Sequence, residues 1–479
     1  MLSRRAVETA VFAAAVSVFI TPFRRDLFVG DETKYAQVIR EMRASGRFFL
    51  PTLGGQPFTH KPPIHFWLID LLTFPLGVYS MWAFVLPSIA AFALLLGLLW
   101  RRGGPLAAFV CATSLLVWAS AQSARMDVSF TLCIAFGLLR LEDFFERDDF
   151  RALLWCAAAL GVATLIKGPM APVIGLVLFF LEWWRRRRVP RGNYLPALAA
   201  LVLIPLAWFI PAMILGGHAY TREVIVKQTV GRAVATWVHS APPWFYILHL
   251  PATLFPWFFL AVAAVIARRW SFLTNWILAV LVPYSLLASK LDVYMMAMIP
   301  AVALLVVECG GHAAARIANA IAAALLILAL AGLFVKIPDV PIQGLCIATA
   351  VAGVIALIVV LRASFETGTV AVGLAALVPL LYVAIVLMPQ VNDLASTRPL
   401  VAALARQQVP GDRIALYWCP YLWTRDMPRD LERVVYADEL TNVHTPVLAV
   451  ARAHAPALPG YRRVDQLRMI GKWFDVYRR

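Results

Sequence analysis

The chain has 479 residues, of which 61% are hydrophobic and 15% are charged. Soluble globular domains are roughly 45–50% apolar, so this composition excludes an ordinary soluble enzyme. The formal net charge of +16 would suit a nucleic-acid-binding protein. The arginine clusters, however, lie at the ends of apolar runs, as at residues 185–188, and this is typical of cytoplasmic anchors of membrane spans. We therefore expect membrane lipids as neighbours and no nucleic acid as a partner.

Repeated apolar runs of about 17–20 residues predict an all-α polytopic membrane protein. The first run covers residues 6–23 and follows the letters MLSRR. It resembles a signal peptide, and we interpret it as an uncleaved first span. With it we expect about thirteen transmembrane helices. The other twelve are expected at residues 81–100, 105–121, 128–144, 152–166, 169–184, 195–215, 250–267, 272–288, 293–309, 318–335, 342–361 and 369–388.

The segment 24–80 is expected to lie mostly outside the membrane. Its apolar piece at 64–75 is short and interrupted by Asp70, which favours an interfacial helix. The cluster at residues 185–191 then falls on the cytoplasmic side; a spanning helix here would reverse the topology and break the positive-inside rule. The predicted external segments are 24–80, 122–127, 167–168, 216–249, 289–292 and 336–341.

After Pro389 the chain becomes rich in Arg, Asp and Pro. The runs RIALYW, RVVYA and PVLAVARA are typical of strands, and RPLVAALARQQ is typical of a helix. We therefore predict a transmembrane domain over 1–389 and a small external α/β domain over 390–479. The six cysteines show neither a disulfide framework nor a metal-binding spacing.

Unusual polar residues gather on the predicted external side. Charges near a bilayer are costly unless they serve a function or extend to the interface. Cations hold phosphate or diphosphate headgroups through charge-assisted hydrogen bonds, and a carboxylate can accept a proton from an attacking hydroxyl. The pattern thus predicts a site for an anionic headgroup. Its candidate residues are Asp31, Glu32, Lys34, Arg40, Arg43, Lys61, Arg125, Asp127, Lys167, Arg222, Lys227, Arg232, His239 and Lys290.

Each candidate also has a structural explanation. Asp31 and Glu32 could form the first turn of a helix, Asp127 could cap the span that follows it, and His239 could be structural. Lys167 is harder to explain, because Gly168 and Pro169 leave irregular backbone at the membrane edge. Taken together, these explanations would require the charges to share one face by coincidence.

The motifs that contain these residues resemble those of a known family. Residues 31–62 hold Asp-Glu, Tyr-Ala, Arg-Glu-Met and Lys-Pro in order, and RMDVSFT, IKGP, KQTVGR, PPWFYI and SKLDVYMMAMIP follow. Over residues 1–310 the sequence is similar to membrane-bound lipid-linked sugar transferases of the protein O-mannosyltransferase type. The likeness is greatest to the bacterial aminoarabinose transferases that modify lipid A. Lys34 stands where these enzymes usually have Arg, and His60 where Glu is common.

The resemblance implies a GT-C glycosyltransferase fold in the bacterial inner membrane, with the active site facing the periplasm. It implies inverting transfer of a sugar from polyprenyl (undecaprenyl) phosphate to lipid A or another envelope glycan. Asp31 and Asp127 would be catalytic, Asp31 as the base or as the carboxylate that orients the acceptor, and Asp127 in positioning the sugar or the acceptor. No cofactor would be required, although His60 and His239 could hold a divalent metal. The substrate-binding residues would be Glu32, Lys34, Tyr35, Lys61, Arg125, Lys167, Lys227, Arg232, His239, Lys290 and Tyr294.

Three alternatives remain open. The first is a protein O-mannosyltransferase-like enzyme that modifies a protein hydroxyl. The second is a polyprenyl-lipid transporter or flippase, for which inverted repeats and charges in mid-span would be expected; here the charges lie at span ends and no repeat is evident. The third is a non-catalytic scaffold whose C-terminal region binds a partner.

Overall fold

The computed structural model describes residues 3–231, 239–310, 312–335, 341–437, 445–456 and 458–479. The chain divides into two compact units. The first, the helical unit, comprises Met1–Phe19, Thr59–His65 and Pro87–Val383. The second, the sheet unit, comprises Ile20–Phe58, Phe66–Leu86 and Ala384–Arg479. The sheet unit therefore combines the predicted first external loop with the C-terminal region.

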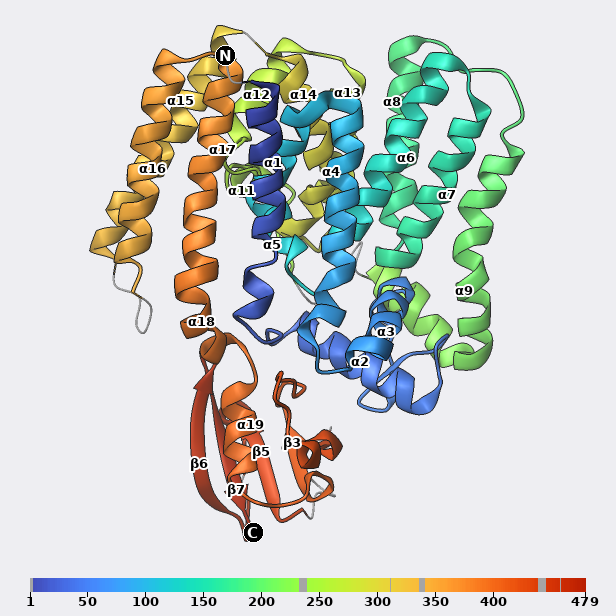
Figure 1. The fold of residues 1–479 in the computed structure, drawn as a ribbon. Coiled ribbons are helices and arrows are strands. Elements are labelled where there is room, and N and C mark those ends of the chain that lie inside the picture. The colour runs from blue at the N-terminus through green and yellow to red at the C-terminus, as the bar shows by residue number, and fades with distance from the viewer. Residues whose placement is uncertain (1–2, 232–238, 311, 336–340, 438–444, 457) are drawn as a thin grey trace. The chain divides into compact units, whose positions relative to one another are not determined.

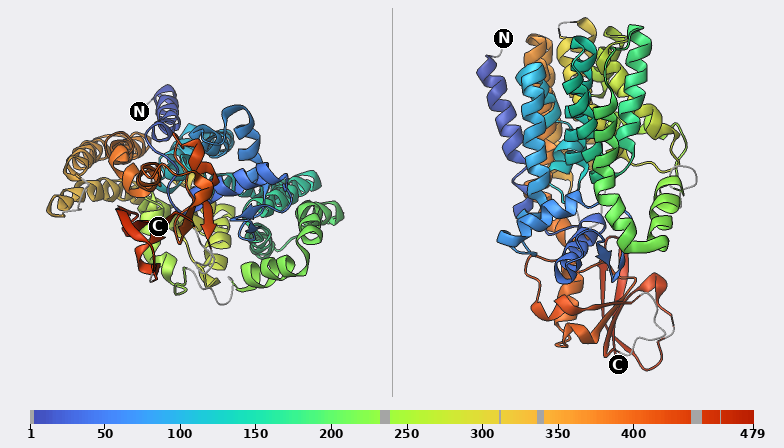
Figure 2. Two further views of the ribbon diagram at one scale, coloured as in Figure 1. Left: turned by 90° about the horizontal axis from the view of Figure 1, so that it is seen from below. Right: turned by 90° about the vertical axis from the view of Figure 1, so that its right-hand side faces the viewer.

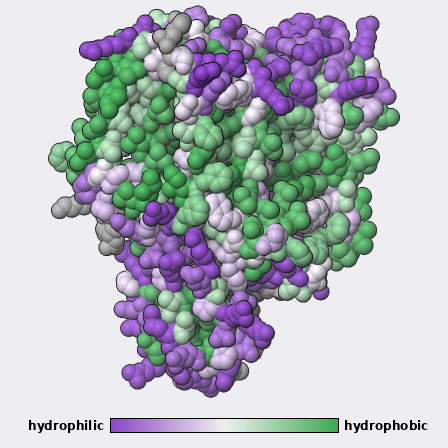
Figure 3. Space-filling model, in the orientation of Figure 1, coloured by the Kyte–Doolittle hydropathy of each residue, from purple (hydrophilic) through white to green (hydrophobic). Residues whose placement is uncertain are grey.

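The helical unit is a bundle whose helices run alongside one another (Figures 1 and 2). Its face in Figure 3 is hydrophobic over the middle of the helices and hydrophilic at the end where α1 begins. Its helices are α1 (Arg4–Ser17), α4 (Met81–Ala112), α5 (Leu115–Ala121), α6 (Asp127–Arg147), α7 (Phe150–Lys167), α8 (Met170–Arg186), α9 (Leu195–Arg222), α11 (Phe245–Thr253), α12 (Phe258–Ala267), α13 (Phe272–Leu286), α14 (Ile299–Glu308), α15 (Ala313–Ile327), α16 (Gln343–Arg362) and α17 (Phe365–Tyr382).

The all-α polytopic class is confirmed, but the number of spans is not. Within the described ranges, seven helices are long and apolar enough to cross a membrane, or eight if the bent pair α11 and α12 is one span. The predicted span 105–121 is interrupted between α4 and α5, and α4 itself is kinked at Gly104. The predicted span 250–267 is also interrupted, because α11 and α12 meet at an angle of 111°. Apolar length alone does not reveal such breaks.

The predicted external loop 216–249 is largely helical where it is described. Helix α9 continues to Arg222 and is followed by a π-helix, η2 (Glu223–Gly231). Arg232 falls outside the described residues. The 3-10 helix η3 (Asp292–Met298) leads directly into α14, so the predicted helix 293–309 is present with an irregular first half.

The N-terminal part of the sheet unit holds η1 (Thr21–Phe23), α2 (Asp31–Ser45), the short pair β1 (Thr52–Leu53) and β2 (Gln56–Pro57), and all of α3 (Ile64–Leu76) except its first two residues, which belong to the helical unit. Helix α3 has 13 residues and is about 20 Å long at 1.5 Å per residue. A bilayer core is about 30 Å thick, so α3 is too short to cross it. This length agrees with the interfacial helix that was predicted because the apolar run is short and is interrupted by Asp70.

The C-terminal part of the sheet unit is the expected α/β fold. A five-stranded sheet has the order β4-β3-β5-β7-β6, in which β3 pairs in parallel with β4 and β5, and β7 is antiparallel to its neighbours. The apolar face of α19 (Arg398–Ala405) packs in one core with Ile414, Val447 and Phe474. The strands are β3 (Ile414–Tyr417), β4 (Val435–Ala437), β5 (Val447–Ala451), β6 (Arg462–Met469) and β7 (Lys472–Arg478).

The first three strands and α19 confirm the predicted runs, whereas the hairpin β6–β7 was not predicted. Strand β6 reads RRVDQLRM and is mostly exposed, so it lacks the apolar alternation by which a half-buried strand is recognised. The hairpin turns at Ile470 and Gly471, both with positive φ, as tight two-residue turns require.

The turn between α7 and α8 depends on a glycine. Gly168 has φ 105° and ψ −171°, a region of backbone space that is essentially reserved for glycine. It immediately follows Lys167, the last residue of α7, and Pro169 precedes α8. The direction of the chain here, and with it the position of Lys167, therefore depends on Gly168.

We expect Gly168→Ala to lower the stability of the helical unit by about 1–3 kcal/mol, the usual cost of such a strained backbone. A Cβ there would meet no atom within 4 Å, so the loss would come from the backbone alone. The matched control is Gly97→Ala, within α4, where a Cβ also meets nothing within 4 Å and φ is not positive. Unfolding in detergent measures both; equal stability of the two variants would contradict the prediction.

Candidate active site

A buried ion cluster lies where α6 begins and α7 ends. Asp127, the first residue of α6, is 2% exposed, and its Oδ2 accepts a hydrogen bond from Arg125 Nε at 3.0 Å. Its Oδ1 pairs with the ammonium group of Lys167, the last residue of α7. The two helices pack closely along their lengths, which brings residues 40 positions apart in the chain together.

Lys167 is also surrounded by aromatic rings. Its Nζ lies 4.8 Å from the centre of the Tyr294 ring and 5.5 Å from that of Phe130. The Tyr294 ring stacks on Tyr284 at 4.8 Å. Rings attract a cation through their electron-rich faces, more strongly when water is excluded. The ammonium group of Lys167 is thus held between a carboxylate and aromatic faces.

Asp127 precedes the apolar run of α6, and several charges act on it. Burial alone would raise the pKa of its carboxyl group, but the charges of Lys167, Arg125 and Lys61 outweigh burial and hold the pKa below its usual range. Asp127 is therefore an anion near neutral pH. Three cations thus act on one carboxylate, and cations of this kind can bind a phosphate group by charge-assisted hydrogen bonds.

His65 and Ser88 support the segment that leads into Asp127. His65 is fully buried, and its Nε2 lies 3.2 Å from the carbonyl oxygen of Ala124. Ser88 Oγ donates to the Arg125 carbonyl at 2.8 Å. Burial lowers the pKa of His65 to about 4, more than the Ala124 contact and the Asp127 charge raise it. His65 is therefore neutral near pH 7 and acts as a rigid support.

The segment that contains His60 and Lys61 lies against η2. Gln228 Nε2 donates to Thr59 Oγ1 and to Glu223 Oε1, both at 3.4 Å. Lys227, about half exposed, pairs with Glu223 at 2.9 Å. This pairing places Lys227 on the surface of a helical turn rather than within the Asp127 cluster. The charge of His60 also acts on the Glu223 carboxyl group.

Lys290 and His239 lie on two loops that contact each other. Lys290 is 3% exposed, and its Nζ donates to the carbonyl oxygens of Ala241, at 2.9 Å, and Leu287. Its backbone N–H donates to the His239 carbonyl at 3.0 Å. The imidazole of His239 is exposed. Lys290 thus ties the two loops together through their backbones.

The sequence analysis did not predict one pair of ionisable residues. His249 Nδ1 lies 2.8 Å from Asp292 Oδ1, and the His249 ring stacks on Phe245 at 3.7 Å. Asp292 lies two residues from both Lys290 and Tyr294. The only signal in the sequence was an acidic residue within SKLDVYMMAMIP; nothing there indicated a histidine 43 residues away.

The other acidic candidates belong to the sheet unit. Asp31 begins α2 and is exposed, and Gly30 before it has φ 125°. Glu32 is buried and accepts hydrogen bonds from Arg25, at 2.5 and 2.8 Å, and from Phe28 N–H at 2.8 Å. Tyr35 is buried against Phe66, and Lys34 is half-buried. The first turn of α2 therefore has an inward Glu32 and an outward Asp31.

The helical unit thus brings Lys61, Arg125, Asp127, Lys167 and Tyr294 together, whereas Asp31, Glu32, Lys34 and Tyr35 share one helix of the sheet unit. In the part of the chain that the structure describes, no group of three or more His, Cys, Asp and Glu side chains could hold a metal ion. His60 and His239 as metal ligands stay a prediction.

The pairing of Asp127 with Lys167 can be measured by a double-mutant cycle. Both side chains are buried, so removal of either partner leaves the other charge poorly compensated. We expect Asp127→Asn and Lys167→Met each to destabilise the protein, with a coupling of about 1–3 kcal/mol. Unfolding in mixed detergent–SDS micelles is the measurement.

The control cycle uses the exposed pair of Arg4 and Glu8 on α1, for which a coupling below about 1 kcal/mol is expected. Additive effects of the Asp127 and Lys167 substitutions would show that the two charges do not depend on each other.

His65 should make the protein sensitive to acid. Its folded pKa of about 4 lies below the ordinary 6.5, so the unfolded chain binds a proton first as the pH falls. The contribution of neutral His65 to the free energy of unfolding is complete above pH 6.5. It is lost between pH 6.5 and 4, by about 3 kcal/mol in total. His65→Gln should remove this part of the pH dependence, whereas His218→Gln, at an exposed position, should retain it. Unfolding at several pH values tests this.

The sequence was compared with protein-family models and with curated proteins. The family model for dolichyl-phosphate-mannose-protein mannosyltransferase matches residues 60–213. An undecaprenyl phosphate-alpha-4-amino-4-deoxy-L-arabinose arabinosyl transferase of Pseudomonas aeruginosa is 29% identical over 67% of this chain. Its counterpart in Serratia proteamaculans is 25% identical over 63%. These matches span 62% and 58% of the relatives' own lengths.

Solved structures share the fold over nearly the whole chain. The crystal structure of ArnT from Cupriavidus metallidurans bound to undecaprenyl phosphate has a TM-score of 0.77 and 19% identity, covering 99% of this chain and 98% of that one. Its apo form has a TM-score of 0.76 and 17% identity, covering 98% and 97%. The chain therefore shares the fold of these ArnT structures, and its residues 60–213 match the family model of the dolichyl-phosphate-mannose-protein mannosyltransferases.

Proposed function

We propose that this multi-pass membrane protein is an inverting glycosyltransferase that takes a sugar from a polyprenyl phosphate. The observation that carries the proposal is the buried Asp127 carboxylate with Lys167 and Arg125 bonded to it and the charge of Lys61 acting on it. Several cations gathered at the end of apolar helices suit a donor with an anionic phosphate and a hydrocarbon chain.

The chemistry needs two kinds of group. An acceptor oxygen attacks the anomeric carbon from the face opposite the phosphate, the carbon–oxygen bond to the phosphate breaks, and the configuration inverts. Negative charge then grows on the departing polyprenyl phosphate, and Lys61, Arg125 and Lys167 would stabilise it. A carboxylate that accepts the proton of the acceptor completes the reaction. By the resemblance of its motif, this base is Asp31, which is exposed on α2.

Asp127 has a different role in this proposal. It stays ionised, because three cations act on it, and it aims Lys167 and Arg125 toward one region. Such preorganised charges act without rearranging during the reaction. Glu32, Tyr35, Lys34, Lys227, Arg232, His239, Lys290 and Tyr294 remain predicted substrate-binding residues; among them, Glu32 and Lys290 already bond strongly to the protein's own groups.

The names of the relatives support the substrates. Those relatives are named as arabinosyl transferases that use undecaprenyl phosphate-linked aminoarabinose, and the ArnT structure contains undecaprenyl phosphate. We therefore propose undecaprenyl phosphate as the carrier and lipid A, or another envelope glycan, as the acceptor. The site would face the periplasm of a bacterial inner membrane. No cofactor is invoked in the proposed steps.

The match to the mannosyltransferase model favours a second candidate, transfer of a hexose to a protein hydroxyl. Mass spectrometry of lipid A from cells with and without the gene separates the two. We expect the gene to be required for an added amino-pentose. Unchanged lipid A with loss of a protein-linked hexose would support the second candidate instead.

The role of Asp31 can be tested in the same cells. Asp31→Asn should lower transfer by at least about 100-fold, because the acceptor loses its base, while the protein stays folded, since Asp31 is exposed. The matched control is Asp412→Asn, an exposed aspartate of the sheet unit, which should keep full activity. Retained transfer by Asp31→Asn would remove Asp31 from the mechanism.

A further inference from the structure

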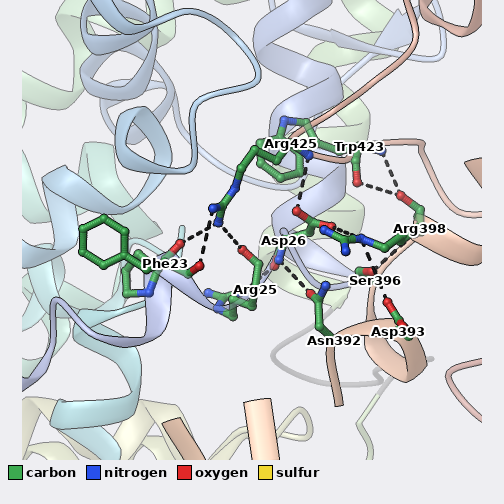
Figure 4. Close-up of polar contacts among 11 residues, drawn as sticks. Phe23, Arg25, Asp26, Asn392, Asp393, Ser396, Arg398, Trp423 and Arg425 are labelled. Carbon is green, nitrogen blue, oxygen red and sulfur yellow. Dashed lines mark hydrogen bonds and ion pairs between the residues drawn. The ribbon is translucent and has the colours of Figure 1, made fainter. Parts of the chain in front are cut away.

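The residues before Asp31 are held by the C-terminal region of the sheet unit. Residues 22–29, which run from η1 toward α2, bond to Asn392, Ala395, Arg398 and Arg425, which lie more than 360 positions later in the chain. Figure 4 shows Asn392, Arg398 and Arg425 gathered around Asp26. None of these later residues belongs to the motifs by which the family resemblance was recognised.

Asp26 is the centre of this network. It is fully buried, and its Oδ2 accepts a hydrogen bond from Arg398 Nε at 3.0 Å. Its Oδ1 accepts one from the Arg425 backbone N–H at 3.3 Å, and its own N–H donates to Asn392 Oδ1 at 2.7 Å. A buried carboxylate requires such partners, because an unpaired one is costly.

Arg425 binds the backbone of the same segment. Its guanidinium donates to the carbonyl oxygens of Pro22, at 2.8 Å, and Arg25, at 2.9 Å, and makes a longer contact of 3.4 Å with Phe23. Five N–H groups in a planar fork allow one arginine to bind several acceptors at once. The Val29 N–H also donates to the Ala395 carbonyl at 2.8 Å.

The held segment in turn fixes the start of α2. Arg25 and the Phe28 N–H are the hydrogen-bond partners of the buried Glu32 carboxylate. Glu32 is the neighbour of Asp31 in the first turn of the helix. Gly30, with φ 125°, is a flexible residue directly before Asp31. The direction of this turn therefore depends on Glu32 and, through Arg25 and Phe28, on the C-terminal contacts.

We propose that Arg398 and Arg425 of the C-terminal region are positioning residues for the transfer reaction, which act through Asp26, Arg25 and Glu32 to orient Asp31. This assigns a task to the C-terminal region, and it rests on the proposed function of Asp31. The sheet with α19 has its own hydrophobic core, so the loss of one arginine at its border leaves that core intact.

The test uses the full-length protein in detergent or nanodiscs with Arg425→Met and Arg398→Met. We expect amide hydrogen exchange in residues 26–33 to quicken by on the order of tenfold, with exchange in β5 unchanged. The kcat for sugar transfer should fall by at least about tenfold, while the KM for the polyprenyl phosphate donor stays within about twofold, because the proposed phosphate-binding cations belong to the helical unit. Arg425→Lys should recover part of the rate.

The matched control is Arg413→Met, which removes an exposed arginine from the same region and should alter neither exchange nor kcat. Quicker exchange with full kcat would overturn the proposal, as would a lost kcat with unchanged exchange in residues 26–33. A general loss of protection in β5 would assign Arg425 to folding instead. Activity of Asp31→Asn, measured in parallel, separately reports whether the proposed base is correct.

Discussion

The cost of burying a charge next to an apolar membrane bundle governs this structure. An ionised carboxylate in such surroundings persists only with cations beside it. Asp127 meets this condition with Lys167 and Arg125, and the packing of α6 against α7 supplies the geometry. Three positive charges act on this one carboxylate. Cations gathered in this way are the groups that the proposed phosphate site requires.

The same constraint operates at other points of the chain with a different result. Glu182 of α8 is fully buried and accepts hydrogen bonds from Arg185, Arg186 and Asn275 of α13. Asp26 is satisfied by Arg398, Arg425 and Asn392. Here each carboxylate joins two elements of one unit. Pairing of buried charges thus connects elements in these places, whereas at Asp127 we propose that it also serves the transfer reaction.

Gly168 and His65 restrict the backbone conformation of the candidate site. Gly168 allows the chain to turn directly after Lys167, and neutral His65 supports the segment before Asp127. Together they restrict the backbone on which Asp127 and Lys167 lie, and the proposed reaction depends on such preorganised charges.

The sequence by itself determined the membrane class, the candidate residues and the C-terminal α/β fold, because hydropathy, charge position and strand patterns are local properties. Lys167 and Asp127 stood out because a charge beside an apolar run is visible in one dimension. Only the tertiary structure decided the partners: Asp26 and Arg398 are 372 positions apart, and His249 with Asp292 had no local signal. It also decided where helices break, as between α11 and α12, because packing and not apolar length sets the path of the chain.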